Sequence, residues 1–127
     1  MSNELFKTKI SGETLAFNLG DHGQERNLIC TEEERQIFDY VSDMIGEASL
    51  DPSVLRLVRK SENYISIVMD SSGDYGAMDL ARVKYTNRAK WIKFGPRFER
   101  INIDAPADAL AHPEEAVAAY RANEPYL

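Results

Sequence analysis

The sequence predicts an α+β fold, in which one antiparallel sheet is packed by one central helix and one C-terminal helix. Three observations support this prediction. A capping box opens an amphipathic segment near residue 31, short β-compatible runs follow between residues 54 and 104, and an alanine-rich segment comes last. The chain has 127 residues without an internal repeat or linker, so we expect a single domain over residues 1–127.

The first predicted element is a β-hairpin, formed by Leu5–Ile10 and Thr14–Leu19 around the turn residues Ser11 and Gly12. One register places five apolar side chains on one face, whereas a slip of one residue scatters them over both faces. These side chains are Phe6, Ile10, Leu15, Phe17 and Leu19. We therefore expect this hairpin, with one apolar face, to be part of the antiparallel sheet.

A helix is predicted to begin after Thr31, where the local signal is clearest. Thr31 as the N-cap residue and Glu34 three positions later form a capping box, and Glu32 and Glu33 favour the positive end of the helix dipole. Gly46 is predicted to end this helix as the C′ residue. The apolar residues on one face of the helix are Phe38, Val41, Met44 and Ile45, with Ile37 as a further candidate. The pattern indicates a surface helix laid on a core.

The stretch from Val54 to Asp104 predicts a meander of four or five antiparallel strands, because turn residues recur at short spacing and leave no room for crossover helices. We place the strands near residues 54–60, 63–70, 77–85, 89–95 and 98–104. A C-terminal helix is predicted to start with Pro113 at its first position and acidic residues in its first turn, and to end before Asn123 and Pro125.

The net charge of −6 is distributed unevenly along the chain. Residues 82–100 carry seven basic side chains and one acidic side chain, whereas residues 1–81 have a net charge of −8 and residues 101–127 a net charge of −4. An acidic chain as a whole is repelled by nucleic acid and by anionic membranes. A local basic segment can still bind an anion, because charges more than about 8–10 Å away are largely screened at physiological salt.

Two strands that flank Asn87 in this basic segment form the candidate binding surface. Paired residue numbers sum to 175 whether the loop has two residues or four, so Lys84 faces Trp91 and Arg82 faces Lys93. One face then gathers a tryptophan and three cations, while the opposite face gathers Ala81, Val83, Ile92 and Phe94. The candidate binding residues are Arg82, Lys84, Arg88, Trp91, Lys93 and Arg97.

This cluster has three interpretations. It is a structural feature, with Trp91 under a helix and cations that stabilise the indole; it is the anchor of a protein interface, where Trp and Arg are enriched; or it is a stacking platform for single-stranded nucleic acid. An ordinary solvated basic face, or one that pairs with the acidic helix, requires no ligand at all.

We expect a small cytoplasmic binding protein without catalytic activity, of the adaptor, inhibitor or immunity type, that acts on a protein partner. The first alternative is a module that binds single-stranded nucleic acid through the Trp91 hairpin. The second is a metal-dependent nuclease that uses Asp70, Asp74 or Asp79 with Lys84 or Lys90. A homodimer in which the acidic helix meets the basic hairpin is a further alternative.

No motif in the sequence indicates a cofactor, a metal site or a membrane segment. His22 and His112 have no partner at metal-ligand spacing, and no apolar run approaches the roughly 18 residues of a membrane helix. The N-terminus also lacks the apolar run of a signal peptide, so we expect a cytosolic protein. The single cysteine, Cys30, fits a reducing compartment, and we expect it to be a buried, inert thiol.

Overall fold

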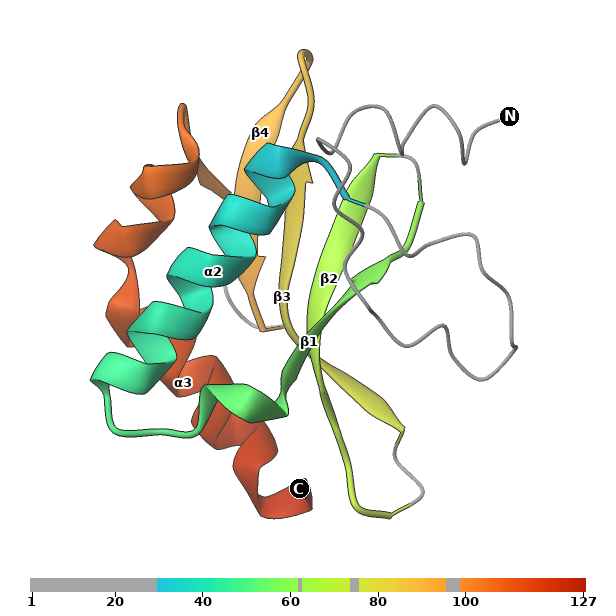
Figure 1. The fold of residues 1–127 in the computed structure, drawn as a ribbon, viewed down its shortest axis with the longest axis vertical. Helices are drawn as coiled ribbons and strands as arrows, with labels where there is room; N and C mark the ends of the chain where they lie inside the picture. The colour runs from blue at the N-terminus through green and yellow to red at the C-terminus, as the bar shows by residue number, and fades with distance from the viewer. Residues whose placement is uncertain (1–29, 62, 74–75, 96–98) are drawn as a thin grey trace.

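A computed structural model describes residues 30–61, 63–73, 76–95 and 99–127. The hairpin predicted over residues 5–19 lies outside the described residues. In the described part, a five-stranded antiparallel sheet in the order β1-β2-β3-β4-β5 carries the helices α2 and α3 on one face, which confirms the predicted α+β class and the meander (Figure 1). The strands are β1 (Leu55–Arg59), β2 (Tyr64–Asp70), β3 (Ala77–Tyr85), β4 (Lys90–Phe94) and β5 (Ile101–Asn102).

Among the described residues, the helical layer consists of α2 (Glu32–Glu47) and α3 (Pro113–Asn123), together with three short 3₁₀ segments. The 3₁₀ segments are η2 (Pro52–Val54), η3 (Pro106–Ala111) and η4 (Glu124–Tyr126). The start and end of α3 agree with the prediction to within one residue. The last strand ends at Asn102, earlier than the predicted residue 104, because the backbone N–H groups of Asp104 and Ala105 donate to the Asp108 carboxylate and turn the chain into η3.

The core lies between the inner face of the sheet and the helical layer. Apolar side chains at the period of a helix in α2 meet alternate side chains of the strands, and most of them are fully buried. The largest fully buried side chains include Phe94, Ile37, Ile45, Leu57, Ile65, Ile67, Met69, Leu80 and Ile92. Burying one such side chain contributes about 1.5–3 kcal/mol, so this interface stabilises both layers.

Hydrogen bonds from Tyr120 and Asn123 anchor α3 to the rest of the fold. The Tyr120 hydroxyl donates to the Asp51 carbonyl at 3.0 Å, and the Asn123 side-chain amide donates to the Asp79 carbonyl at 3.1 Å. The second bond reaches the sheet at a β-bulge, where Ile67 pairs with Ala81 but Val68 pairs with Asp79. Leu80 is the extra residue, and it is buried in the core.

The start of α2 is the predicted capping box. The backbone N–H of Glu34 donates to the Thr31 hydroxyl at 3.1 Å, and the Glu34 carboxylate accepts from the Thr31 N–H at 2.9 Å. Two backbone donors at the helix start are thereby satisfied by side chains.

The end of α2 corrects the prediction for Gly46. The helix continues through Gly46 to Glu47, and Ser49 adopts the left-handed conformation with φ of 65°. The N–H of Leu50 donates to the Ile45 carbonyl, and the N–H of Ser49 donates to the Gly46 carbonyl, which is the Schellman pattern. Leu50 packs against the core, and this contact places the stop three residues later than a glycine signal indicates.

Replacing Gly46 with alanine should raise the free energy of unfolding by about 0.5–1 kcal/mol, because Gly46 occupies the interior of a helix. An added Cβ would meet the Pro52 side chain at 3.8 Å, an ordinary van der Waals distance. Urea denaturation measures the change. As a complementary variant, Ser49→Gly should also stabilise, because glycine adopts a positive φ without strain. If Gly46→Ala destabilised the protein, Gly46 would be the C′ residue after all.

Candidate functional site

The pairing of β3 with β4 places the predicted binding residues as the sequence indicated. Lys84 pairs with Trp91, Arg82 with Lys93, and Val83 with Ile92, so the predicted register is confirmed. The predicted core residues Ala81, Val83, Ile92 and Phe94 are all buried on the inner face. The other face of these strands, which we call the outer face, points away from α2 and α3 (Figure 1).

The outer face has an ordered layout because neighbouring strands are in register. One row across the sheet contains Tyr64, Lys84, Trp91 and Asn102, which are successive partners on β2 to β5. The next row contains Ser66, Arg82 and Lys93. In the first row, Lys84 therefore lies between two aromatic residues at the spacing of adjacent strands, about 5 Å, and in the second row two cations are neighbours.

Trp91 is partly exposed, and one face of its ring is covered by Arg100. The guanidinium carbon of Arg100 lies 4.3 Å from the centre of a Trp91 ring, within cation–π distance. Because α2 and α3 lie on the opposite face of the sheet, Trp91 does not lie under either of these two helices of the described residues (Figure 1). The prediction did not include Arg100, although the pairing of Ile92 with Ile101 places it beside Lys93.

Arg82 is held by two contacts. Its Nε donates to the Asp79 carboxylate at 2.9 Å, and its guanidinium lies 5.8 Å from the centre of the Tyr64 ring. Both arginines of the outer face therefore lie against an aromatic ring, one over Tyr64 and the other over Trp91. Such stacking fixes the orientation of a guanidinium and leaves some of its N–H donors directed outward.

The two lysines of the outer face are in a different situation. Within the described part of the chain, neither Lys84 nor Lys93 takes part in an ion pair with a carboxylate. Arg88 is exposed in the turn between β3 and β4, where its backbone N–H donates to the Thr86 hydroxyl. The sixth predicted residue, Arg97, lies outside the described residues. The outer face thus has an excess of positive charge.

The open part of the outer face ends at β2. Ser66 and Val68 are completely buried, although they are on the face opposite the helices. Beyond them, Arg56 on β1 binds the carboxylate of Asp70 through two hydrogen bonds of 2.6 and 2.7 Å. The candidate surface is therefore confined to β3, β4 and the residues around β5.

The ion pair between Arg56 and Asp70 makes the stability of the fold depend on pH. The hydrogen bond from Arg56 holds the pKa of Asp70 below its usual 3.8. A carboxylate whose pKa is lower in the folded state stabilises the fold above its unfolded pKa, and that stabilisation is lost as the pH falls through the folded pKa. Hydrogen bonds from Ser53 and from the backbone of Asp104 and Ala105 lower the pKa of Asp51 and Asp108 in the same direction.

We expect Asp70→Asn to be less stable than the unmodified protein at neutral pH, and the difference to shrink below about pH 4, where the unfolded carboxylate binds its proton. Guanidinium denaturation at pH 7 and at pH 3 measures the difference in the free energy of unfolding between the two proteins. The stability difference between Arg56→Met and the unmodified protein should shrink in the same way at low pH, because this variant removes the other partner of the ion pair. A difference that stayed constant between pH 7 and pH 3 would contradict the assignment.

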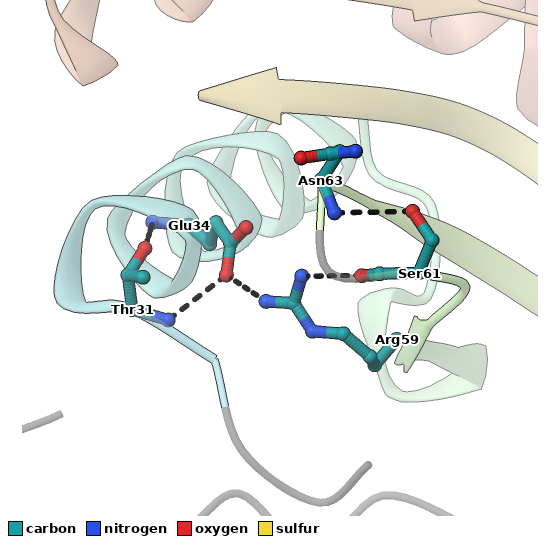
Figure 2. Close-up of polar contacts among 5 residues, drawn as sticks. All are labelled: Thr31, Glu34, Arg59, Ser61 and Asn63. Carbon is teal, nitrogen blue, oxygen red and sulfur yellow. Dashed lines mark hydrogen bonds and ion pairs between the residues drawn. The ribbon is translucent and has the colours of Figure 1, made fainter. Parts of the chain in front are cut away.

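A second polar cluster joins the start of α2 to the end of β1, and sequence reasoning missed it. Arg59 donates from Nη2 to the Glu34 carboxylate and from Nη1 to the Ser61 carbonyl, the latter at 2.8 Å (Figure 2). The side chains of Arg59 and Glu34 are only 7% and 3% exposed, so the ion pair is buried. Nothing in the local sequence links these residues, because they lie 25 positions apart.

Cys30 lies beside this ion pair and is buried, as predicted. Burial and, to a smaller extent, the charge of Glu34 raise the pKa of its thiol to about 12. The reactive thiolate is therefore scarce at neutral pH, and Cys30 is a poor nucleophile. This cluster is consequently a structural element that fixes α2 on the sheet.

Replacing Arg59 with methionine should lower the free energy of unfolding by about 3–5 kcal/mol, because the Glu34 carboxylate would remain buried without its guanidinium. Denaturant unfolding followed by circular dichroism measures the loss. The double variant Arg59→Met with Glu34→Gln should recover part of it, since glutamine removes the charge and still completes a capping box. A loss below about 1 kcal/mol would show that the pair is no more than a surface ion pair.

The described residues that were considered for metal-dependent catalysis each contact a different partner. Asp70 is bonded to Arg56 and Asp79 to Arg82, while Asp74 lies outside the described residues. Lys90 lies 5.2 Å from the centre of the Tyr85 ring, on the helix side of the sheet. Within the described ranges, no group of three or more His, Cys, Asp or Glu residues is placed to hold a metal ion. His112 lies 3.6 Å from the Glu115 carboxylate, and His22 is outside those ranges.

Comparisons with known proteins find no match for this chain, so its function is inferred from the fold and the outer face. No family model matches the chain, and neither the curated proteins nor the solved structures contain a significant match. Among the described residues, no helix has the length and apolar character required to cross a membrane. In its described part, the chain is an α+β protein with a five-stranded meander.

Proposed function

We propose that this chain is a non-catalytic binding protein that uses the outer face of β3 and β4 to bind an acidic surface of another protein. The observation that supports this proposal most directly is the position of Lys84 and Lys93. They are cross-strand neighbours of Trp91 and Arg82, and neither is neutralised by a carboxylate in the described part of the chain. A basic face on which these two lysines have no carboxylate partner among the described residues is suited to electrostatic steering of an acidic partner.

The acidic side chains of α2 leave this face available. The exposed carboxylates of α2 are on the other side of the sheet (Figure 1). A helix is about 10 Å thick, which is comparable to the Debye length of about 8 Å at physiological salt. Carboxylates on the far side of α2 therefore screen the outer face only weakly, and the face attracts anions despite the negative net charge of the chain.

The contacts of the aromatic rings favour a protein partner over single-stranded nucleic acid. A base needs a free ring face on which to stack. Arg100 already covers one face of Trp91, and Arg82 lies over Tyr64. In this arrangement the rings orient guanidinium groups, which bind carboxylates through paired N–H donors. Stacking of a base on the ring face that Arg100 covers would require Arg100 to leave the indole.

The opposite placement of the charged surfaces also bears on self-association. In a two-fold dimer, each copy would have to offer its acidic helix and its basic strands to the partner at the same time. Because α2 and the outer face lie on opposite sides of the sheet, the acid-to-base contact favours a head-to-tail arrangement over a two-fold dimer (Figure 1). We therefore propose a different protein as the partner. A cytosolic location belongs to the same proposal, since the one cysteine in the sequence is a buried free thiol.

The fluorescence of Trp91 tests the proposal directly, because Trp91 is the only tryptophan in the sequence. A glutamate-rich peptide should change the emission of the full chain at about 0.01 M salt and bind more weakly at about 0.15 M. The double variant Lys84→Gln with Lys93→Gln should bind this peptide at least about 5-fold more weakly, as expected for losing two charge contacts. Lys60→Gln, an exposed lysine after β1, is the matched control and should bind normally.

The nucleic-acid alternative is tested in the same titration. An oligothymidylate that quenches Trp91 while the glutamate-rich peptide does not would overturn the protein-partner proposal. A protein captured from the source cells should be retained by the unmodified chain and by Lys60→Gln, and lost from the double variant. Equal capture by all three chains would place the interface elsewhere.

A further inference from the structure

The outer face contains a hollow at the end of β3 and β4, next to the β-bulge. It is lined by Asp79, Ala81, Arg82, Lys93 and Gly95. The bulge directs Leu80 into the core, and Gly95 follows β4 without a side chain. Gly95 is held there by a hydrogen bond of 2.8 Å from its N–H to the Leu80 carbonyl, and its φ of 66° suits glycine.

The charges around this hollow are unequal. Arg82 and Lys93 face each other across the strand pair, whereas Asp79 supplies the only carboxylate among its lining residues. Asp79 accepts a hydrogen bond from the Nε of Arg82, which leaves the two terminal nitrogens of that guanidinium without a hydrogen bond in the described part of the chain. Lys93 has no carboxylate partner there. The hollow therefore has donors for one more anionic group.

We infer that this hollow is the subsite that receives an aspartate or glutamate side chain of the protein partner, an inference that rests on the proposed function. A carboxylate has two acceptor oxygens, and donors from Arg82 and Lys93 on adjacent strands can approach both of them. Electrostatic interactions are stronger in a concave site with protein walls than on an open surface, so this position contributes more than the open lysine, Lys84. Asp79 is then an internal competitor for the guanidinium of Arg82.

Because Asp79 competes with the ligand carboxylate for Arg82, substitutions in the hollow should change the affinity for the peptide in opposite directions. Lys93→Met should weaken binding of the glutamate-rich peptide about 5-fold, and Lys84→Met, with the same change in charge, by less than about 2-fold. Asp79→Asn should strengthen binding about 3-fold, because it removes repulsion and frees Arg82. Its matched control is Glu99→Gln, which makes the same change in charge at an exposed position outside the hollow and should have little effect. Titration of Trp91 fluorescence at low salt gives all four affinities.

The outcomes separate this inference from the proposed function. If Lys93→Met and Lys84→Met weaken binding equally, and Asp79→Asn and Glu99→Gln strengthen it equally, the peptide responds to overall charge and the hollow is not a subsite, while the proposed function stands. If the unmodified chain fails to bind the peptide at low salt, both are overturned. A circular dichroism spectrum of each variant that matches the unmodified protein shows that a lost affinity is not a lost fold.

Discussion

The register between β3 and β4 is the constraint on which the rest of this structure depends. Side chains alternate between the two faces of a strand, so a single pairing assigns every residue of the hairpin to the core or to the outer face. Ala81, Val83, Ile92 and Phe94 fill the inner face, and a slip by one residue would bury Arg82 and Lys93 in their place. The cost of burying unpaired cations makes that alternative register unfavourable.

In this part of the sheet, α2 and α3 cover the inner face, and the register places the basic residues on the outer face. The helix α2, which carries exposed acidic residues, therefore lies on the opposite side of the sheet from the outer face of β3 and β4 (Figure 1). The buried pair of Glu34 and Arg59 supports this arrangement, because it ties the first turn of α2 to the edge strand β1 (Figure 2). A protein with segregated charge can be attracted to an acidic partner at one face even though its net charge is negative.

Features that depend on neighbouring residues were predictable from the sequence. The capping box at Thr31, the strand positions and the pairing of Lys84 with Trp91 all follow from spacings within a few residues. The end of α2 was not predictable in this way. Gly46 is the residue that the local signal selects, but contact of Leu50 with the core extends the helix and requires Ser49 to adopt a positive φ. Tertiary packing there outweighs a glycine preference of about 1 kcal/mol.

By itself, the sequence determined the α+β class, the approximate positions of the strands and the gathering of Arg82, Lys84, Trp91 and Lys93 on one face. These are consequences of local periodicity and of hairpin geometry. Only the tertiary structure decided that Arg100 covers the indole, that Glu34 and Arg59 form a buried pair, and that a bulge at Leu80 leaves a hollow beside Lys93. Each of these joins residues from different elements, whose distance and burial depend on how the layers pack and not on any short sequence pattern.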